Sequence, residues 1–419
     1  MIMKALTKIS IGFLALVAVA LWFTSCSSED VAQNGGSQGN TYLTLSINTG
    51  AVSNTRASAW TDSDPAKTDE NKINNMTVGI FDKDGNVRTI VDLAENKTGK
   101  SVPNSYTLST VSGSTIATAN IVTSSLTATD VVLVAVNAPA NKFAGVTTKR
   151  GFNGVKETLA DAVASTKTET NTKIPMYGQA NLTGSGSNYT ATVDVYHMLA
   201  KVTLKSLKVD FKADGPYKSA EFTPTAFFMI NVPEDFLFNG TVANKLNEAW
   251  TPTTSMYHAW NKDGDYTLAN PDATSMGKYA QYLTTEALGI TSALTGNAGA
   301  TSTNTCPKKA CFYVTPSATT TGEKNMKLVI AGTFKNGSTT STVYYPVPLN
   351  ANYAADGTVS PAVSGTTTYA VYPNVDYQCK VVIRSIGATT PNANLSPETA
   401  TITVTVKDFV PATQNTEFN

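Results

Sequence analysis

Residues that carry enzyme chemistry are scarce in this chain. It has two histidines, His197 and His258, and its Asp and Glu residues are scattered, mostly beside turns. No Gly-x-Ser-x-Gly, phosphate-loop or His-x-x-x-His motif occurs. His197 lies in Val-Tyr-His-Met-Leu, where side chains alternate as in a strand, so a structural histidine is favoured over a general base. Paired carboxylates stay open because their pairing is spatial. We expect no enzymatic activity and no metal or other cofactor.

Cys26 is the residue for which the sequence suggests a covalent modification. Residues 1–25 have the organisation of a signal peptide, with basic Lys4 and Lys8 before an apolar stretch. Phe23-Thr-Ser-Cys26 then places small residues before a cysteine, as in a lipobox. We expect lipidation of Cys26, and the alternative is an ordinary signal peptide cut elsewhere. No second apolar stretch is long enough to span a bilayer, so we expect a soluble or lipid-anchored mature protein.

The remaining cysteines are Cys306, Cys311 and Cys379, an odd number that leaves at least one unpaired. Cys306-Pro-Lys-Lys-Ala-Cys311 could close a small disulfide loop in an oxidising compartment. The alternative is cysteines without a special role. The spacing is poor for zinc, and no histidine lies nearby.

Arg56 is one of only four arginines in the chain and lies in a small, polar run. The preceding stretch, residues 41–48, alternates strictly: Leu43, Leu45 and Ile47 point one way, as in a strand with one buried face. A protease that cuts between Arg56 and Ala57 would remove this strand from its own domain. We therefore predict a propeptide, residues 26–56, with a removable strand whose loss leaves an open groove.

The C-terminal stretch has the same kind of pattern. Ala400, Ile402, Val404 and Val406 alternate with threonines, and residues 386–396 before them are rich in Gly, Thr, Pro and Asn. We predict a flexible lead at 386–396 and a donor strand within 395–419 that fills the groove of another molecule. Val404 lies in the middle of the apolar face and is expected to reach the deepest part of that groove.

The elements between the two ends are mainly strands. A hairpin is expected at 76–81 and 87–93 around Asp82-Lys-Asp-Gly85, where a tight turn is favoured over a calcium loop because the later calcium ligands are missing. The apolar run 129–137 predicts a central strand, and residues 154–167 have helical spacing. Further strands are expected at 189–195, 199–207, 226–233, 311–315, 326–334, 342–348 and 372–384.

Composition and spacing together indicate an all-β protein of sandwich type. Lys plus Arg equals Asp plus Glu, 31 each, which argues against nucleic acid as a partner. The strands at 189–195 and 199–207 are expected to close an N-terminal domain, residues 57–210, before a C-terminal domain, residues 211–419. The long polar stretch 239–310 contains Trp250, Tyr257, Trp260, Tyr279 and Tyr282. These aromatic residues could stack on sugars or hold a loop against the sandwich.

In their order along the chain, these landmarks resemble the Bacteroidales fimbrillins, the type V pilins of the FimA and Mfa types. The resemblance rests on the lipobox at Cys26, Arg56, Val78-Gly-Ile-Phe-Asp82, Ile174-Pro-Met-Tyr-Gly178, Leu199-Ala-Lys-Val-Thr-Leu204, residues 374–383, and the C-terminal strand with Asp408-Phe409. It departs at Phe409, where the family often has Trp, and in the 239–310 stretch.

The resemblance implies two tandem transthyretin-like β-sandwich domains with a few short helices. It implies export as an outer membrane lipoprotein precursor, cleavage by an arginine-specific or trypsin-like protease, and polymerisation into an extracellular fimbrium with copies of itself and related subunits, in support of adhesion or biofilm formation. An intact donor strand favours a stalk subunit over an anchor or a tip. The competing class is a monomeric surface lipoprotein that binds glycan or host protein through the 239–310 loops.

Overall fold

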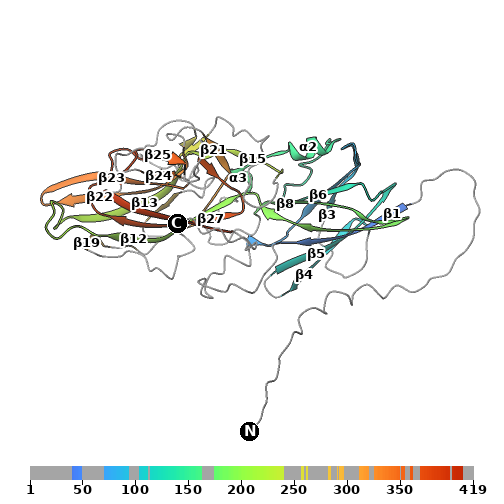
Figure 1. Ribbon diagram of the computed structural model, residues 1–419, viewed down its shortest axis with the longest axis horizontal. Coiled ribbons are helices and arrows are strands. Elements are labelled where there is room, and N and C mark those ends of the chain that lie inside the picture. The colour runs from blue at the N-terminus through green and yellow to red at the C-terminus, as the bar shows by residue number, and fades with distance from the viewer. Residues whose placement is uncertain are drawn as a thin grey trace, which may run out of the picture. The chain divides into compact units, whose positions relative to one another are not determined.

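The computed structural model describes residues 40–49, 70–93, 103–111, 114–162, 174–239, 256–258, 261–262, 282–284, 290, 292–296, 311–319, 325–349, 351–353, 359–361, 369–396 and 399–408. This part of the chain is built almost entirely of strands, with two short helices (Figure 1). The prediction of an all-β fold is confirmed.

Two five-stranded sheets form a sandwich in the first half of the chain. The first, called the β1 sheet, has the order β4 (Ser105–Val111), β5 (Ser114–Ser124), β1 (Asn40–Asn48), β10 (Asn188–Asp194), β9 (Thr183–Ser185). The second, called the β6 sheet, has the order β11 (Tyr196–His197), β8 (Met176–Asn181), β6 (Val131–Val136), β2 (Met76–Phe81), β3 (Val87–Leu93).

The β6 sheet buries apolar side chains on both of its faces, and its middle strand, β6, shows this. It is the middle strand of its sheet, as the apolar run predicted, and it buries side chains on both faces. Val132 and Val134 face the core shared with the β1 sheet, whereas Leu133 and Ala135 belong to the larger core that continues into the second half. The absence of polar alternation in this strand follows from burial on both faces.

The hairpin β2–β3 contains the predicted turn. The Asp82 carboxylate accepts hydrogen bonds from the backbone N–H groups of Asp84, at 3.0 Å, and Asn86, at 2.8 Å. The hydrogen bond from Asn86 is the main cause of the lowered pKa of Asp82. Gly85 adopts φ +83°, which glycine tolerates without strain. The turn is confirmed, and the carboxylate serves the turn itself.

The helix predicted at 154–167 is confirmed only at Leu159–Ala162 within its described part. A short helix, α2 (Lys149–Asn153), ends at Gly154, and Thr148 caps it by accepting from the Gly151 N–H. Residues Lys156–Thr158 form a strand, β7, that pairs with β15 (Asp235–Leu237), and only α3 (Leu159–Ala162) is helical afterwards. Pairing with a segment far along the chain overrides the local helical spacing. Residues 163–167 lie outside the described part.

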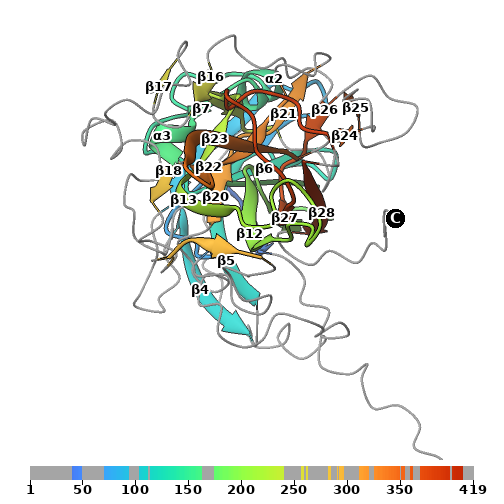
Figure 2. The same cartoon turned by 90° about the vertical axis from the view of Figure 1, so that its left-hand side faces the viewer.

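The second half contains two larger sheets. The first has the order β20 (Cys311–Val314), β12 (Ala200–Val209), β27 (Val375–Ile383), β28 (Ala400–Asp408), and Figure 2 shows β12, β27 and β28 side by side. The second has the order β18 (Tyr282–Thr284), β13 (Glu221–Ile230), β22 (Lys327–Asn336), β23 (Thr339–Pro348), with β19 (Leu294–Thr295) also paired to β13.

Short pairs complete the described fold. They are β14 (Val232–Pro233) with β16 (Met256–His258) and β17 (Asn261–Lys262), β21 (Ser317–Thr319) with β26 (Tyr369–Val371), and β24 (Ala351–Tyr353) with β25 (Val359–Pro361).

The sequence pattern suggested that β12 closes the first sandwich, but β12 joins another sheet. It runs parallel to β27 from Lys201 opposite Asp376 to Val209 opposite Ile383, and antiparallel to β20. Both neighbours come from the second half. The alternation in 199–207 correctly predicted a strand, but alternation alone does not say which sheet a strand joins.

Candidate functional site

β1 is an interior strand although it is the first described element of the chain. It pairs antiparallel with β5 from Asn40 opposite Ser124 to Asn48 opposite Ile116. On its other edge it pairs parallel with β10 from Tyr42 opposite Asn188 to Asn48 opposite Asp194. Its removal would therefore leave the facing edges of β5 and β10 without hydrogen-bond partners, a strong template for another strand.

The inward face of β1 fills the core between the two sheets of the first sandwich. Leu43, Leu45 and Ile47 expose 1%, 0% and 0% of their surface, as predicted for the removable strand. The structure adds Thr41 and Thr49, which are also buried and continue the period of two. The Thr41 hydroxyl donates to the Thr123 carbonyl at 2.9 Å and accepts from the Leu126 N–H at 3.4 Å.

Small residues beside β1 make room for its large side chains. Leu45 lies between Ala119 on β5 and Ala191 on β10, and we call this position the Leu45 site.

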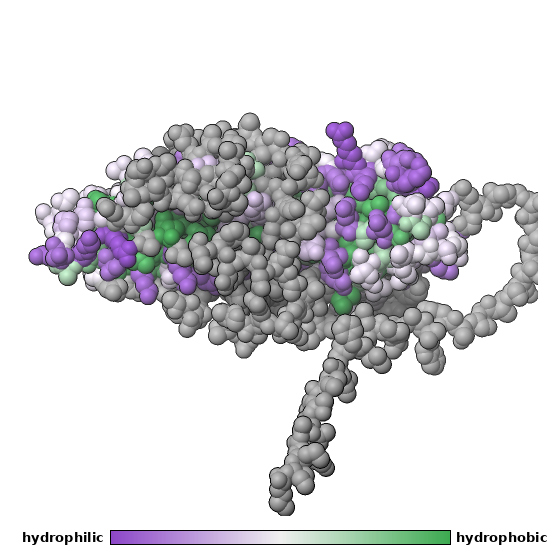
Figure 3. Space-filling view, in the orientation of Figure 1, coloured by the Kyte–Doolittle hydropathy of each residue, from purple (hydrophilic) through white to green (hydrophobic). Residues whose placement is uncertain are grey.

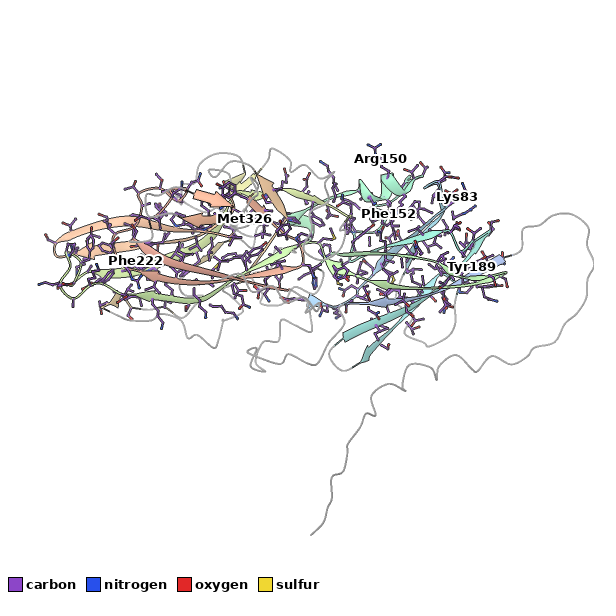
Figure 4. The ribbon with its side chains drawn as sticks, in the orientation of Figure 1. Lys83, Arg150, Phe152, Tyr189, Phe222 and Met326 are labelled. Atoms are coloured by element: carbon purple, nitrogen blue, oxygen red, sulfur yellow. The ribbon has the colours of Figure 1, made fainter. Side chains whose placement is uncertain are left out.

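The two other apolar positions have larger neighbours. Ile47 lies between Ala117 and Val193, and Leu43 lies between Ile121 and Tyr189, which Figure 4 labels on β10. Burial of each apolar side chain of β1 contributes about 1.5–3 kcal/mol. A first sandwich without β1 would therefore need a substitute.

The predicted donor strand is β28, and in this structure it lies on its own chain. It pairs antiparallel with β27 along its whole length, from Ala400 opposite Ile383 to Asp408 opposite Val375. It is the last strand of its sheet, so only one of its edges is paired there. Ala400 is 3% exposed, whereas Ile402 and Val404 are only partly buried against the core. The side chain of Val406 lies outside the described part.

The lead to β28 is packed, so the expectation of a flexible lead at 386–396 is wrong. Lys327, itself buried, donates from Nζ to the Asn392 carbonyl at 2.8 Å and to Asn392 Oδ1 at 3.0 Å. Tyr344 and Ala388 exchange backbone hydrogen bonds, and Leu395 is 6% exposed. Gly, Pro and Asn residues predict irregular backbone correctly, but their polar groups here bind neighbouring strands.

A buried polar cluster surrounds Glu70, the first described residue after Thr49. The Glu70 carboxylate accepts from Lys201 Nζ on β12 at 2.7 Å and, by a short hydrogen bond, from the Tyr313 hydroxyl on β20. Both side chains of the ion pair are 5% exposed. Burial raises the pKa of Glu70, and Lys201 opposes that rise. The cluster fixes Glu70 to strands of the second half.

Asp376 adds a second buried carboxylate next to Lys201 in strand register. It accepts from the Thr203 hydroxyl at 2.8 Å and from the Gln378 side-chain amide at 2.9 Å. Burial raises its pKa as well. No sequence pattern predicted this arrangement, because its members are isolated charges in separate strands.

His197 is a buried structural residue, as predicted. Its Nε2 lies 3.0 Å from the Glu70 carbonyl oxygen, and its Nδ1 lies 3.3 Å from Asn374 Oδ1. Burial lowers the pKa of His197 to about 4. The ring therefore stays neutral at physiological pH, and it joins β11 to the segment at Glu70.

Both ends of the segment 50–69, which carries Arg56, meet the described fold at the same place. The Asn48 carbonyl accepts from the Val195 N–H at 3.0 Å, and the Glu70 carbonyl lies against His197, two residues further along. The chain therefore leaves β1 and returns at Glu70 beside the same strand ending. Cys26, Arg56 and Ala57 themselves lie outside the described residues.

Other sequence expectations also fall outside the described part. Trp250, Trp260, Tyr279, Cys306 and Phe409 are among these residues. Tyr257, His258, Tyr282 and Cys311 lie in strands whose backbones are paired, but their side chains are not described. The hypotheses of sugar stacking and of a Cys306–Cys311 disulfide therefore stay hypotheses. Cys379 is a buried, free thiol.

Few large hydrophobic side chains are exposed in the described part of the chain. On the face shown in Figure 3, hydrophilic and hydrophobic residues are interspersed over the described strands. Within the described ranges, the exposed large hydrophobic side chains are Tyr42 and Ile386. Over the same ranges, no group of three or more His, Cys, Asp and Glu residues could hold a metal ion, and no helix has the length and apolar character of a membrane span.

Comparison with known proteins supports the resemblance. A crystal structure of a candidate cell adhesion protein from Bacteroides eggerthii DSM 20697 is similar with a TM-score of 0.56 and 22% identity, over 90% of this chain and 98% of that one. A candidate cell adhesion protein from Parabacteroides distasonis ATCC 8503 is similar with a TM-score of 0.53 and 15% identity, over 88% and 98% of the two chains. These likenesses show a shared fold. Among curated proteins, none matches this chain.

A match to a known family lies in the first half of the chain. Residues 41–205 match the family described as major fimbrial subunit protein (FimA), a range that begins in β1 and ends in β12. This match supports a structural role in a fimbria rather than an enzymatic one. The resemblance to the Bacteroidales fimbrillins is confirmed over residues 41–205, which match the FimA major fimbrial subunit family.

Proposed function

We propose that this protein is a fimbrial stalk subunit that polymerises by donor-strand exchange after proteolytic removal of β1. The observation that carries the proposal is the position of β1. It is paired on both edges and buries Leu43, Leu45 and Ile47, yet its C-terminal connection to the rest of the fold runs through residues 50–69. Cleavage between Arg56 and Ala57 would detach residues 26–56 from the domain that they complete.

The anchoring of Glu70 explains how cleavage could spare the rest of the fold. Lys201, Tyr313 and the contact with His197 hold Glu70 on the far side of the cleavage site from β1. The new N-terminal segment would therefore stay attached while β1 leaves. An arginine-specific or trypsin-like protease is the proposed partner for this step.

β28 is the proposed donor because it would gain backbone hydrogen bonds along its second, unpaired edge. On β27 it has one paired edge, whereas the groove between β5 and β10 offers two. Each additional hydrogen bond contributes about 0.5–1.5 kcal/mol net. The loss of the contacts with β27 and the ordering of the transferred strand, about 1–2 kcal/mol per residue, oppose this gain. Exchange therefore needs the apolar face of the donor as well as its backbone.

The wider assignment follows the family resemblance. We propose a signal peptide at 1–25, lipidation of Cys26 in an outer membrane precursor, and release into an extracellular fimbrium after cleavage, in support of adhesion or biofilm formation. The partners are other copies of this chain and related subunits. We place the division between the two tandem sandwich domains between β11 and β12, because β12 pairs only with strands of the second half.

The decisive experiment compares two arginine variants of a precursor that starts at residue 26. Arg56→Ala should block polymerisation triggered by an arginine-specific protease and leave a monomer that retains residues 26–56. Arg150→Ala is the matched control, since Arg150 is exposed on α2, where Figure 4 shows its side chain pointing outward. Polymers are read as a ladder on a gel without boiling, and the N-terminus by mass spectrometry. Normal ladders from Arg56→Ala would contradict strand removal as the trigger.

A further inference from the structure

The inward positions of β1 define how a replacement strand must fit. There are five of them, Thr41, Leu43, Leu45, Ile47 and Thr49, and each is buried. The C-terminal strand has five positions on its corresponding face, four of them apolar and the last an aspartate: Ala400, Ile402, Val404, Val406 and Asp408. A fully overlapping register would therefore bury Asp408 at one end of the groove.

Neither end of the groove suits a carboxylate. At the Thr41 end, the Thr41 hydroxyl donates to the Thr123 carbonyl, and an ionised carboxylate has no proton to donate there. At the other end, Thr49 is 1% exposed. Burying an unpaired charge is strongly unfavourable. The favoured registers are those that seat all four apolar residues and leave Asp408 beyond the last buried position.

Two registers meet this condition, one for each direction of the donor strand. In the direction of β1, Ala400 takes the place of Leu43 and Val406 that of Thr49. In the opposite direction, Ala400 takes the place of Ile47 and Val406 that of Thr41. Both registers put Ile402 in the place of Leu45.

Resting on the proposed donor-strand exchange, we propose that Ile402 is the register-setting residue of the donor strand and occupies the Leu45 site of the next subunit. Side-chain size supports the same assignment independently of charge. The Leu45 site lies between Ala119 and Ala191, so it needs a large side chain to fill it. Ile402 is the largest of the four apolar residues on the donor face. Val404, the centre of the strand in sequence, then occupies a flanking position.

A residue swap tests the assignment without changing the composition of the strand. In the double variant Ile402→Val, Val404→Ile, one methylene group moves from the Leu45 site to a flanking position. Trypsin-triggered polymerisation of the full precursor at limiting concentration should fall about fourfold, the effect of one buried methylene. An unchanged or increased yield would overturn the register. If the unmodified chain formed no polymer, the proposed exchange itself would fail.

Disulfide trapping reads the register directly. Ala119 is the cross-strand neighbour of Leu45, so Ile402→Cys with Ala119→Cys should link neighbouring subunits in the polymer. The ladder should then survive boiling without reductant and collapse with it. Val404→Cys with Ala119→Cys is the matched control, displaced by two residues, about 6–7 Å along the strand, and should not link. Preferential linkage of the control pair would overturn the assignment of Ile402.

Discussion

β1 and β28 are strands of equal length with similar alternating patterns, yet the structure uses them differently. β1 lies inside its sheet, with both edges paired and its apolar face buried. β28 lies at an edge, with one paired neighbour and with Ile402 and Val404 only partly buried. The strand that we propose to be discarded is thus the better integrated of the two, and the strand that we propose to be donated is the more easily released.

This difference gives a physical reason for the proposed proteolysis. A strand with two ladders and a buried face does not leave spontaneously at a useful rate, so its covalent connection must be cut before another strand can compete for its place. An edge strand can exchange without cleavage. Four predictions test this contrast.

The largest effect is expected from a charge on the apolar face of the donor strand. Val404→Asp would bury a carboxylate in the groove of the next subunit, where the charged form is strongly disfavoured. It should abolish the trypsin-triggered ladder while the melting temperature of the monomer falls less, since residue 404 is only partly buried on β27.

Thr403→Asp is the control for that variant. Residue 403 alternates with 404, so the same charge should face the other side of the ladder and most polymer should remain. Equal loss in both variants would contradict the assignment of residues 400–408 as a donor strand.

The second prediction compares truncation in the two strands of the intact precursor. Leu45→Ala removes a fully buried side chain between two alanines and should destabilise the first sandwich by about 2–5 kcal/mol. Val404→Ala should cost less than about 1.5 kcal/mol, because its side chain is only partly buried at an edge. Denaturant unfolding of the precursor measures both. Similar losses would mean that β28 is as firmly held as β1.

The strands at both ends could be predicted from sequence because alternation is a local signal. Their pairing could not. Whether β28 joins β27 or stays free, and which sheet β12 enters, depends on register with distant strands. The helix expected at 154–167 is interrupted for the same reason, since β7 pairs with β15 from far along the chain. The Glu70 cluster was invisible because Lys201 and Tyr313 lie 131 and 243 residues away from Glu70.

The third prediction concerns pH and the anchor of the proposed mature N-terminus. The pKa of His197 is about 4 in the folded protein and about 6.5 ordinarily, so the unfolded chain binds more protons between these values. The stability due to neutral His197 is present above pH 6.5 and is lost as the pH falls through this range, by about 3 kcal/mol in total.

The free energy of unfolding of His197→Gln should therefore fall less between pH 7 and pH 4 than that of the unmodified protein. Assembly at pH 7 should stay unchanged. Glu70 and Asp376, whose pKa values are raised, act in the opposite direction in both proteins, so the difference between the two curves isolates His197. Denaturant midpoints across this range are the measurement. Parallel curves would show that His197 does not titrate as its burial requires.

The smallest effect is expected on the outward face of β1. Tyr42 is 48% exposed, and its backbone N–H donates to the Ser187 carbonyl at 2.8 Å, a bond that does not depend on the side chain. Tyr42→Ala should therefore change the free energy of unfolding of the precursor by no more than about 0.5 kcal/mol. Leu43→Ala, one residue away on the buried face, should cost about 2–5 kcal/mol. Because β1 is absent from the proposed mature subunit, neither variant should change the stability of polymers once they have formed. A large effect of Tyr42→Ala on unfolding would mean that other residues cover the outward face, and β1 would then be held on more sides than its two ladders and its core face provide.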